Sequence, residues 1–383
     1  HKRRMRSSVL ALLIVLLIGQ CIAGKITKKY RWSDVKKWSK KAVGSKVLIV
    51  YSGGTIGMLR GKNGLEPRKG YMANVLRGMS ELQTETSVTY DIVELDPLLD
   101  SSSMSPSDWR RIGDVINAQY NNYDGFVVLH GTDTMQYTAS ALSFMFENLG
   151  KTIVVTGSQI PISEPYTDAK NNLISSLKVA AHLNVPEVVL VFGGLLLRGN
   201  RVTKTSANSL RGFSSINYPP LARLDLRIEL AKPFVLNKPT GAMKYHPEIS
   251  NDIAVLTLYP GITGKTVRAI ANSGVKGIII QAFGEGNAPE NKDFVNALKY
   301  ANDKGIILVD TTQCGNGNVN MDSYAAGSGL KAAHVVNGRD MTVSAAFTKL
   351  ASLIGRGLKN AEVKKMMETD LCGEMSIPQR DEL

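Results

Sequence analysis

Short apolar runs alternate with amphipathic stretches along most of the chain. Seven runs have the length and composition of buried strands, and they lie at 47–51, 125–129, 153–156, 188–192, 253–258, 277–281 and 306–310. Between them, apolar residues recur with helical spacing over 109–122, 138–148, 171–183, 265–271 and 292–304. Strands that alternate with helices at this spacing predict an α/β fold with parallel sheets.

The alternation breaks once, in residues 233–249. This segment contains Pro233, Pro239, Gly241 and Pro247 and no clear periodicity, which is typical of a linker. The length of 383 residues also suggests two domains. We therefore expect a larger amino-terminal domain over 45–232 and a smaller carboxyl-terminal domain over 250–376.

Both ends of the chain carry patterns that are typical of targeting signals. A basic start at Met5-Arg6, an apolar run over 9–19 and small residues before Gly24 predict a signal peptide over 1–24. The run is short for a bilayer span, so we expect no stable membrane anchor after cleavage. In the tail, 377–383, the last four residues Arg380–Leu383 resemble a KDEL-type retention signal. Together these patterns predict a protein of the endoplasmic reticulum lumen or the secretory pathway. A fusion that lacks Arg380–Leu383 and stays in the lumen would contradict the retention signal.

The formal net charge of +13 is concentrated near the amino terminus. Residues 25–46 hold nine lysines and arginines against one acidic residue, Asp34, whereas residues 47–383 hold 33 basic and 32 acidic residues. The folded body is therefore almost neutral. A basic arm over 25–44, with Tyr30, Trp32 and Trp38 interleaved, could contact acidic lipids or RNA. A solvated leader is the simpler interpretation, and we expect no nucleic-acid partner.

The three cysteines, Cys21, Cys314 and Cys372, are too few for a disulfide framework. Cys21 lies in the predicted signal peptide, and the other two could pair in an oxidising lumen or remain free. No Cys-x-x-Cys motif or Cys/His cluster is present, so a zinc site has no support and we expect no metal.

The most informative motif is Tyr-Ser-Gly-Gly-Thr-Ile-Gly at 51–57, directly after the first predicted strand. Glycine tolerates positive φ, so Gly53 and Gly54 allow a sharp turn at the strand end. Thr55 then stands at the carboxyl end of a strand, where open α/β sheets bind their ligands. A plain loop with a capping threonine explains this motif alone equally well. A phosphate-binding loop does not, because Lys62 is not followed by Ser or Thr.

Two further polar clusters follow predicted strands. The motif His-Gly-Thr-Asp-Thr-Met at 130–135 places Thr132 and Asp133 at the same edge as Thr55, although either could simply cap the next helix. The third cluster, 198–205, contains Lys204, which alone would be an ordinary surface lysine. Together they suggest a nucleophile with a base relay, because a threonine hydroxyl is a poor nucleophile until a base takes its proton. A lysine accepts that proton only when desolvation or a relay partner such as Asp133 permits it.

These three motifs resemble the signatures of the L-asparaginase/glutaminase family over about residues 46–374. The stretches 124–146 and 284–291 resemble especially its bacterial cytosolic, type I branch. The absence of a Gly-x-Ser-x-Gly elbow removes a common hydrolytic competitor. The resemblance implies two doubly wound domains, a larger amino-terminal flavodoxin-like parallel sheet and a smaller carboxyl-terminal Rossmann-like domain. It also implies a cofactor-free enzyme that converts L-asparagine to L-aspartate and ammonia.

The resemblance further implies a role for each matching residue. Thr55 would be the nucleophile that forms an acyl-enzyme, while Thr132, Asp133 and Lys204 would activate first the hydroxyl and later a water molecule. The backbone N–H groups of Thr55 and Ser158 would form the oxyanion hole.

The substrate amino acid would be held at both of its charged ends. Ser101 and Ser102 would bind the α-carboxylate, and Asp133 would pair with the α-ammonium. Asn287 matches a position by which a neighbouring subunit completes the site, in a homodimer or homotetramer.

One departure and two alternatives stay open at this point. Leu65 stands where many members of the family have a lid tyrosine, so another residue would have to orient the nucleophile. A non-catalytic binding or regulatory homologue is one alternative. An amidotransferase-type subunit that releases ammonia is the other, although the 22 residues after the signal peptide are too few for the additional domain of such subunits.

Overall fold

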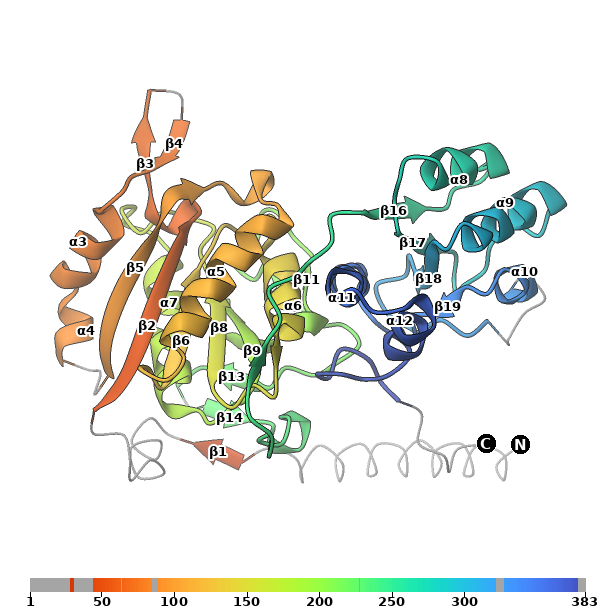
Figure 1. Cartoon of the computed structure of the whole chain (residues 1–383). Helices are drawn as coiled ribbons and strands as arrows, with labels where there is room; N and C mark the ends of the chain where they lie inside the picture. The colour runs from red at the N-terminus through yellow and green to blue at the C-terminus, as the bar shows by residue number, and fades with distance from the viewer. Residues whose placement is uncertain are drawn as a thin grey trace, which may run out of the picture.

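The computed structural model describes residues 28–30, 44–62, 64–84, 88–226, 228–321 and 327–377. The predicted signal peptide, most of the basic arm and nearly all of the tail lie outside these ranges. Within them the chain forms a larger and a smaller α/β unit that lie next to each other (Figure 1). This arrangement confirms the predicted fold class.

Nine strands form the larger sheet, in the order β1-β14-β13-β10-β9-β8-β6-β2-β5. Its parallel strands are β2 (Ser45–Gly53), β5 (Val88–Leu99), β6 (Gly125–Leu129), β8 (Thr152–Thr156) and β9 (Val188–Phe192). Four antiparallel strands extend one edge: β10 (Leu195–Arg198), β13 (Ala222–Leu224), β14 (Ile228–Leu230) and β1 (Lys28–Tyr30). In the parallel part the first strand lies between the second and the third, which is the flavodoxin-like order that the sequence predicts.

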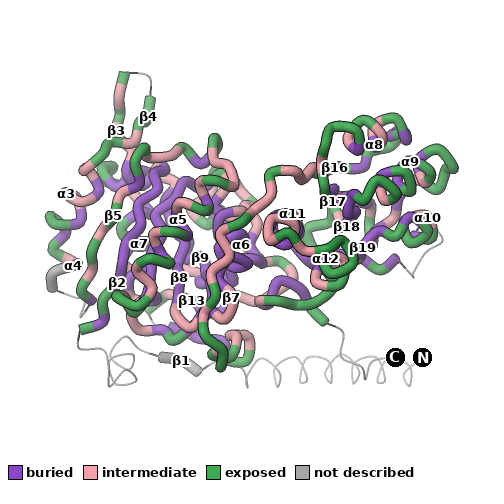
Figure 2. Tube along the Cα trace, viewed as in Figure 1, coloured by how far each residue is buried: buried purple, intermediate pink, exposed green. Residues whose placement is uncertain are grey.

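Helices cover both faces of this sheet because successive side chains of a buried strand point to opposite sides. Val47 and Ile49 of β2 belong to the core beneath α3 (Tyr71–Gly78), α4 (Ser80–Thr84) and α7 (Ala169–His182). Leu48 and Val50 belong to the core beneath α5 (Pro106–Gln119) and α6 (Met135–Met145). The central strands β2 and β8 are accordingly buried along most of their length (Figure 2).

The smaller sheet is parallel throughout, in the order β16-β17-β18-β19. Its strands are β16 (Ile253–Thr257), β17 (Gly277–Ala282), β18 (Ile307–Thr312) and β19 (Val336–Asn337). One apolar core joins it to α8 (Gly264–Ala271), α9 (Lys292–Asp303) and α10 (Ser328–Ala332). A second core, on its other face, joins it to α11 (Val343–Gly355) and α12 (Asn360–Met367).

The remaining elements are short hairpins, 3₁₀ turns and one further pair of strands. The hairpins are β3 (Met58–Gly61) with β4 (Gly64–Pro67) and β11 (Thr203–Lys204) with β12 (Phe213–Ser214). The 3₁₀ turns are η1 (Thr55–Gly57), η2 (Ser101–Ser103), η3 (Gly199–Arg201) and η4 (Lys232–Phe234). The segment 233–249 includes β15 (Lys244–Tyr245), which pairs with β7 (Phe146–Glu147) and so lies against the larger domain.

Two predicted helices are displaced by three residues. The helix predicted over 109–122 begins at Pro106, because Ser105 and Asp108 form a capping box that starts it earlier. The helix predicted over 138–148 begins at Met135 and ends at Met145, because the next two residues pair as β7. Among the described helices, none is long and apolar enough to span a membrane.

Candidate active site

Four adjacent parallel strands of the larger sheet have their carboxyl ends on the same side, which we call the carboxyl edge of the sheet. Each of these strand ends leads to residues that the sequence predicts for the site. Strand β2 leads to Thr55, and β6 leads to Thr132 and Asp133. Strand β5 leads to Ser101, and β8 leads to Ser158. The chain leaves β2 for β5 on one side and then returns to β6 on the other. The cluster therefore lies at the topological switch point, where open α/β sheets bind ligands (Figure 1).

Two glycines bring the loop after β2 against both neighbouring strand ends. A Cβ on Gly53, whose φ is 122°, would lie 2.1 Å from the carbonyl oxygen of Leu99 at the end of β5. A Cβ on Gly54, whose φ is 91°, would lie 2.3 Å from the backbone nitrogen of Gly131. Only glycine fits both the conformation and the space. Thr55 and Thr132 each follow the Gly54–Gly131 contact by one residue, so the fold places them on the same side of the switch point.

Lys204 joins the Thr132–Asp133 pair. Its Nζ donates to Thr132 Oγ1 at 3.0 Å and to Asp133 Oδ1 at 2.7 Å. The Lys204 side chain is 18% exposed, and that of Asp133 is 61% exposed, so the carboxylate lies at the open rim. The Thr132 hydroxyl in turn donates to Gln159 Oε1 at 3.4 Å. A hydroxyl, an ammonium and a carboxylate in hydrogen-bond contact can transfer a proton between them.

Neither Thr132 nor Asp133 caps the following helix. Helix α6 begins at Met135, and no side-chain capping hydrogen bond is present at its start. Thr134 instead donates from Oγ1 to the carbonyl oxygen of Ser101 at 2.7 Å, which ties the end of β6 to the end of β5. The simple capping interpretation of this motif is therefore wrong.

His130, the first residue of the same motif, is buried and stays neutral. Its Nδ1 lies 2.6 Å from the carbonyl oxygen of Gly131, and its Nε2 lies 2.8 Å from Thr138 Oγ1. Burial lowers the pKa of His130 to about 4, so the imidazole is uncharged at neutral pH. A neutral ring donates from Nδ1 to the carbonyl and accepts the Thr138 hydroxyl at Nε2. His130 therefore fixes the peptide that precedes Thr132.

The expected carboxylate-binding serines lie beside the glycine contact. Ser101 is buried, and a Cβ on Gly131 would lie 2.4 Å from its Oγ. Ser102 is exposed, and its backbone N–H donates to Asp100 Oδ1 at 3.0 Å. Ser158 is buried, and its Oγ donates to the carbonyl oxygen of Ile160 at 2.6 Å.

Asn287 lies apart from these residues, in the smaller domain. It is half-buried in the connection between β17 and α9. Its backbone exchanges two hydrogen bonds with Phe283, at 2.9 and 2.8 Å. In the described part of this single chain, no hydrogen bond links it to Thr55, Thr132 or Lys204. The structure thus brings seven of the eight sequence-predicted site residues to one edge and leaves Asn287 elsewhere.

Two glutamines complete the network, and neither was predicted as a site residue. Gln159 accepts from Thr132, and Gln136 Oε1 accepts the backbone N–H of Lys204. Each lies next to a motif that the sequence singles out, Gln136 directly after 130–135 and Gln159 directly after Ser158. Adjacency to those motifs is the signal that could have identified them.

The position of the expected lid tyrosine is in the β3–β4 hairpin. Leu65 there is 44% exposed. Tyr51 lies in β2, shortly before η1 in the chain. Its side chain is fully buried, and its hydroxyl has no hydrogen-bond partner among the described residues. A Cβ on Gly57 would lie 2.2 Å from that hydroxyl, so Tyr51 supports the turn that begins with Thr55. Burial raises the pKa of Tyr51 well above its ordinary value, so the phenol stays protonated.

The two described cysteines are free thiols, and the described residues form no metal site. Cys314 is exposed, Cys372 is half-buried, and both are free thiols, so they do not pair. Within the described ranges, no group of three or more His, Cys, Asp or Glu side chains is arranged to hold a metal ion.

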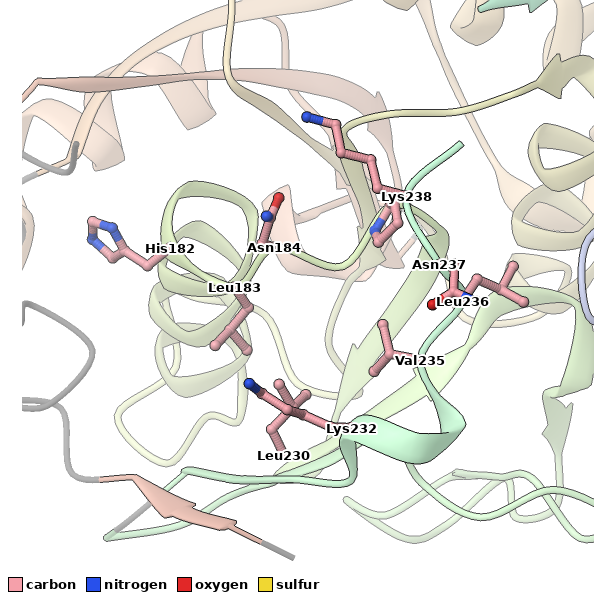
Figure 3. Close-up of a pocket in the computed structure, with 10 residues that line it drawn as sticks. His182, Leu183, Asn184, Leu230, Lys232, Val235, Leu236, Asn237 and Lys238 are labelled. Carbon is pink, nitrogen blue, oxygen red and sulfur yellow. The ribbon is translucent and has the colours of Figure 1, made fainter. Parts of the chain in front are cut away.

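A separate cavity of about 270 Å³ opens at the other end of the sheet (Figure 3). Its walls come from the end of α7, the end of β14 and the residues after η4. Its lining includes the apolar side chains of Leu183, Leu230 and Val235 and the lysines Lys232 and Lys238. It contains none of the sequence-predicted site residues, because α7 ends at the amino-terminal edge of the parallel strands.

Comparisons with known proteins cover nearly the whole described fold. The family described as "Asparaginase, N-terminal" matches residues 46–236, and "Glutaminase/Asparaginase C-terminal domain" matches residues 252–367. L-asparaginase 1 of Escherichia coli is 44% identical over 330 residues, which cover 86% of this chain and 98% of that protein. The crystal structure of L-asparaginase I from Vibrio cholerae matches with a TM-score of 0.81 and 44% identity, covering 87% of this chain and 99% of that chain.

Two relatives that carry other names match at lower identity than these two asparaginases. The 60 kDa lysophospholipase of Mus musculus is 38% identical over 362 residues, which cover 88% of this chain and 64% of that protein. One subunit of the glutamyl-tRNA(Gln) amidotransferase of Thermococcus kodakarensis is 34% identical over 310 residues, which cover 77% of this chain and 70% of that protein.

Proposed function

The chain belongs to the asparaginase family, and we propose that it hydrolyses the side-chain amide of L-asparagine to L-aspartate and ammonia. One observation carries the proposal. Lys204 Nζ bonds both Thr132 and Asp133 at the sheet edge where the Gly53–Gly54 turn presents Thr55. An amide requires an activated nucleophile and a proton for its leaving nitrogen, and this group of residues can supply both.

In the proposed reaction, Thr55 Oγ attacks the amide carbon of the substrate. Its proton passes into the Thr132–Lys204–Asp133 relay and from there to the departing nitrogen, which leaves as ammonia. Water then cleaves the new Thr55 ester. The relay takes a proton from the water as its oxygen adds to the acyl carbon, and it returns a proton to Thr55 Oγ when the bond between Oγ and that carbon breaks, which frees L-aspartate and restores the hydroxyl. Backbone N–H groups of Thr55 and Ser158 face the oxygen that becomes negative in each tetrahedral intermediate.

The substrate backbone is held on either side of Thr55. The exposed Asp133 carboxylate attracts the α-ammonium, and the hydroxyls of Ser101 and Ser102 donate to the α-carboxylate. A free amino acid needs this combination because it carries one charge of each sign. Asparagine and glutamine differ by one methylene, which changes binding by about 1–3 kcal/mol, so some glutaminase activity accompanies the main reaction.

The active unit is proposed to be a homodimer or a tetramer of such dimers. Asn287 is remote from Thr55 within one chain, although it matches a substrate-site position of the family. A second copy of the chain would place its own Asn287 at this edge. Each site would then contain residues from two subunits.

The test is ammonia release from L-asparagine and L-glutamine by the purified full-length protein. We expect turnover of asparagine, and a loss on the order of 10⁴-fold or more in Thr55→Ala, because the nucleophile is removed. Lys204→Met should lose about 10²–10⁴-fold, because the proton relay is broken. A wild type that releases no ammonia from either amide would favour the non-catalytic homologue. Release only in the presence of a transfer-RNA substrate would favour the amidotransferase alternative.

A further inference from the structure

The backbone that leads to Lys204 is held by residues from far along the chain. Four residues, Arg198–Arg201, form a turn at the end of β10 and in η3, which we name the arginine turn. Arg201 is buried, and its Nε donates to the carbonyl oxygen of Gly373 at 2.7 Å. Its Nη1 donates to Asp340 Oδ2, also at 2.7 Å. Both acceptors belong to the smaller domain.

The other polar members of the arginine turn contact the same segment. Arg198 Nη1 donates to the carbonyl oxygen of Gly373 at 3.2 Å, while its Nε and Nη2 bind the buried carboxylate of Glu187. Asn200 Nδ2 donates to the carbonyl oxygen of Cys372 at 3.0 Å. The carbonyl of Gly373 thus accepts hydrogen bonds from two buried arginines.

The segment 370–376, which we name the strap, is itself fixed to the smaller domain. Glu374 and Lys349 of α11 form an ion pair at 2.5 Å in which both side chains are 0% exposed. The Glu374 carboxylate also accepts the backbone N–H of Cys372 at 2.8 Å. Ser376 donates its backbone N–H to Asp340 Oδ1 at 2.7 Å and its hydroxyl to Asp340 Oδ2 at 2.6 Å. The strap therefore has little freedom to move independently of the smaller sheet.

Only two residues separate the arginine turn from Lys204. Val202 is fully buried, and Thr203 pairs with Ser214 in the β11–β12 hairpin. Because these two residues are packed and paired, a displacement of the Arg201 backbone also displaces Lys204. Catalytic groups that are misplaced by about 1 Å can lose about 10²-fold in rate.

We propose that Arg198 and Arg201 are positioning residues, through which the strap of the smaller domain sets the place of Lys204 against Thr132 and Asp133. The proposal rests on the proposed function, in which Lys204 relays the proton. It assigns a task to the smaller domain within its own chain, besides the contribution of Asn287 to a second copy. Arg201 forms a buried ion pair with Asp340, which is itself bonded to Ser376 of the strap. Separating that pair would leave a buried charge without its partner, which is strongly destabilising, so Arg201 moves with the strap.

Gly373 offers a sharp test. Its φ is +80°, and a Cβ would lie 2.4 Å from Arg198 Nη1. Gly357 has a φ of +71° in the same domain, and a Cβ there would meet nothing within 4 Å. Gly373→Ala and Gly357→Ala therefore impose similar backbone strain, but only the first displaces the arginine turn.

We expect Gly373→Ala to lower kcat for asparagine by at least about tenfold with little change in KM, because Lys204 shifts while the substrate-binding residues, Asp133 among them, stay in place. Gly357→Ala should keep the kcat of the wild type. Equal kcat values in the two variants, both folded, would overturn the proposal.

Two further measurements keep the proposal testable if Gly373→Ala does not fold or the wild type lacks activity. Ser376→Ala removes the hydroxyl that donates to Asp340 Oδ2 and accepts from Arg201 Nη2 at 3.5 Å. We expect a severalfold fall in kcat at unchanged KM. The NMR signal of ¹³C-methylated Lys204, assigned with Lys204→Arg, should shift in Ser376→Ala and not in Gly357→Ala. This NMR signal does not depend on turnover. It therefore tests whether the strap positions Lys204 separately from whether the protein hydrolyses asparagine. A Lys204 signal that does not move in Ser376→Ala would contradict the positioning role, whether or not the wild type is active.

Discussion

Asp310, within β18, is a carboxyl group that the fold keeps neutral. It is 0% exposed, and neither of its oxygens has a hydrogen-bond partner in the described part of the chain. A Cβ on Gly286 would lie 2.6 Å from Oδ2, so the turn that carries Asn287 closes directly over it. This desolvation raises the pKa of Asp310 from 3.8 to about 8.

Asp310→Asn should therefore stabilise the protein in alkaline solution. Between about pH 4 and pH 8 the folded carboxyl holds its proton while the unfolded one has lost it, so the free energy of unfolding falls as the pH rises. Each pKa unit of difference corresponds to about 1.4 kcal/mol. The variant lacks this dependence, so its advantage should grow from pH 5 to pH 8 by an amount on the order of several kcal/mol. Urea unfolding at both pH values measures the change, and a pH-independent difference between the two proteins would contradict it.

At the residue scale, the sequence motifs located the reacting groups but not their supports. Thr132, Asp133 and Lys204 could be associated because each follows a strand end or matches a family motif. The role of His130 could not be predicted, because it depends on a contact with Thr138 that only the folded backbone creates. Gln159 could be noticed from its place next to Ser158, but its hydrogen bond with Thr132 could not be predicted. Arg198 and Arg201 were equally hidden, since their acceptor Gly373 lies more than 170 residues away in the chain.

At the element scale, the turn between β2 and η1 depends on glycine at position 54. Gly54→Ala should abolish most activity, by about 10²-fold or more, because its methyl group would push η1 away from Gly131 and move Thr55. Gly274, in the smaller domain, has a φ of 93° against 91° for Gly54, and a Cβ there would meet nothing within 4 Å. Gly274→Ala is thus a control for backbone strain. Comparable kcat values in the two variants would show that the close approach to Gly131 is unimportant.

The elements that the sequence predicted are those with a clear apolar period. Strands β6 and β9 have the predicted bounds because all five residues of each are buried. Strand β5 escaped prediction because it lies at the edge of the sheet, where polar residues such as Asp91 and Glu94 are tolerated. Strands β13 and β14 escaped because three residues carry too little pattern.

At the scale of the whole molecule, the separation of Asn287 from Thr55 has a direct consequence. If each site uses Asn287 of the partner chain, Thr55→Ala and Asn287→Ala impair different halves of one shared site. Mixed dimers of the two variants should then contain one site with both residues intact. We expect the mixture, after dissociation and reassociation, to recover up to about a quarter of the wild-type activity, if subunits pair at random. Each variant reassociated alone is the control, and a mixture no more active than the controls would place Asn287 in the same site as its own Thr55.

The α/β fold class was accessible from sequence because parallel strands that alternate with helices have a strong periodic pattern. The antiparallel additions to the larger sheet were not, and neither were the contacts between the strap and the arginine turn. Both depend on pairing between distant segments, which leaves little trace in a local pattern. The predicted location in the secretory pathway stays a prediction, since the residues that support it lie outside the described ranges.

The central claim is that Thr55 forms a covalent ester with the substrate. Acid quenching during turnover of L-asparagine, followed by mass spectrometry of the digested protein, locates that ester. We predict an aspartyl adduct on the peptide that contains Thr55, absent from Thr55→Ala. An adduct on Thr132 or on any other residue, formed at the rate of turnover, would contradict the account.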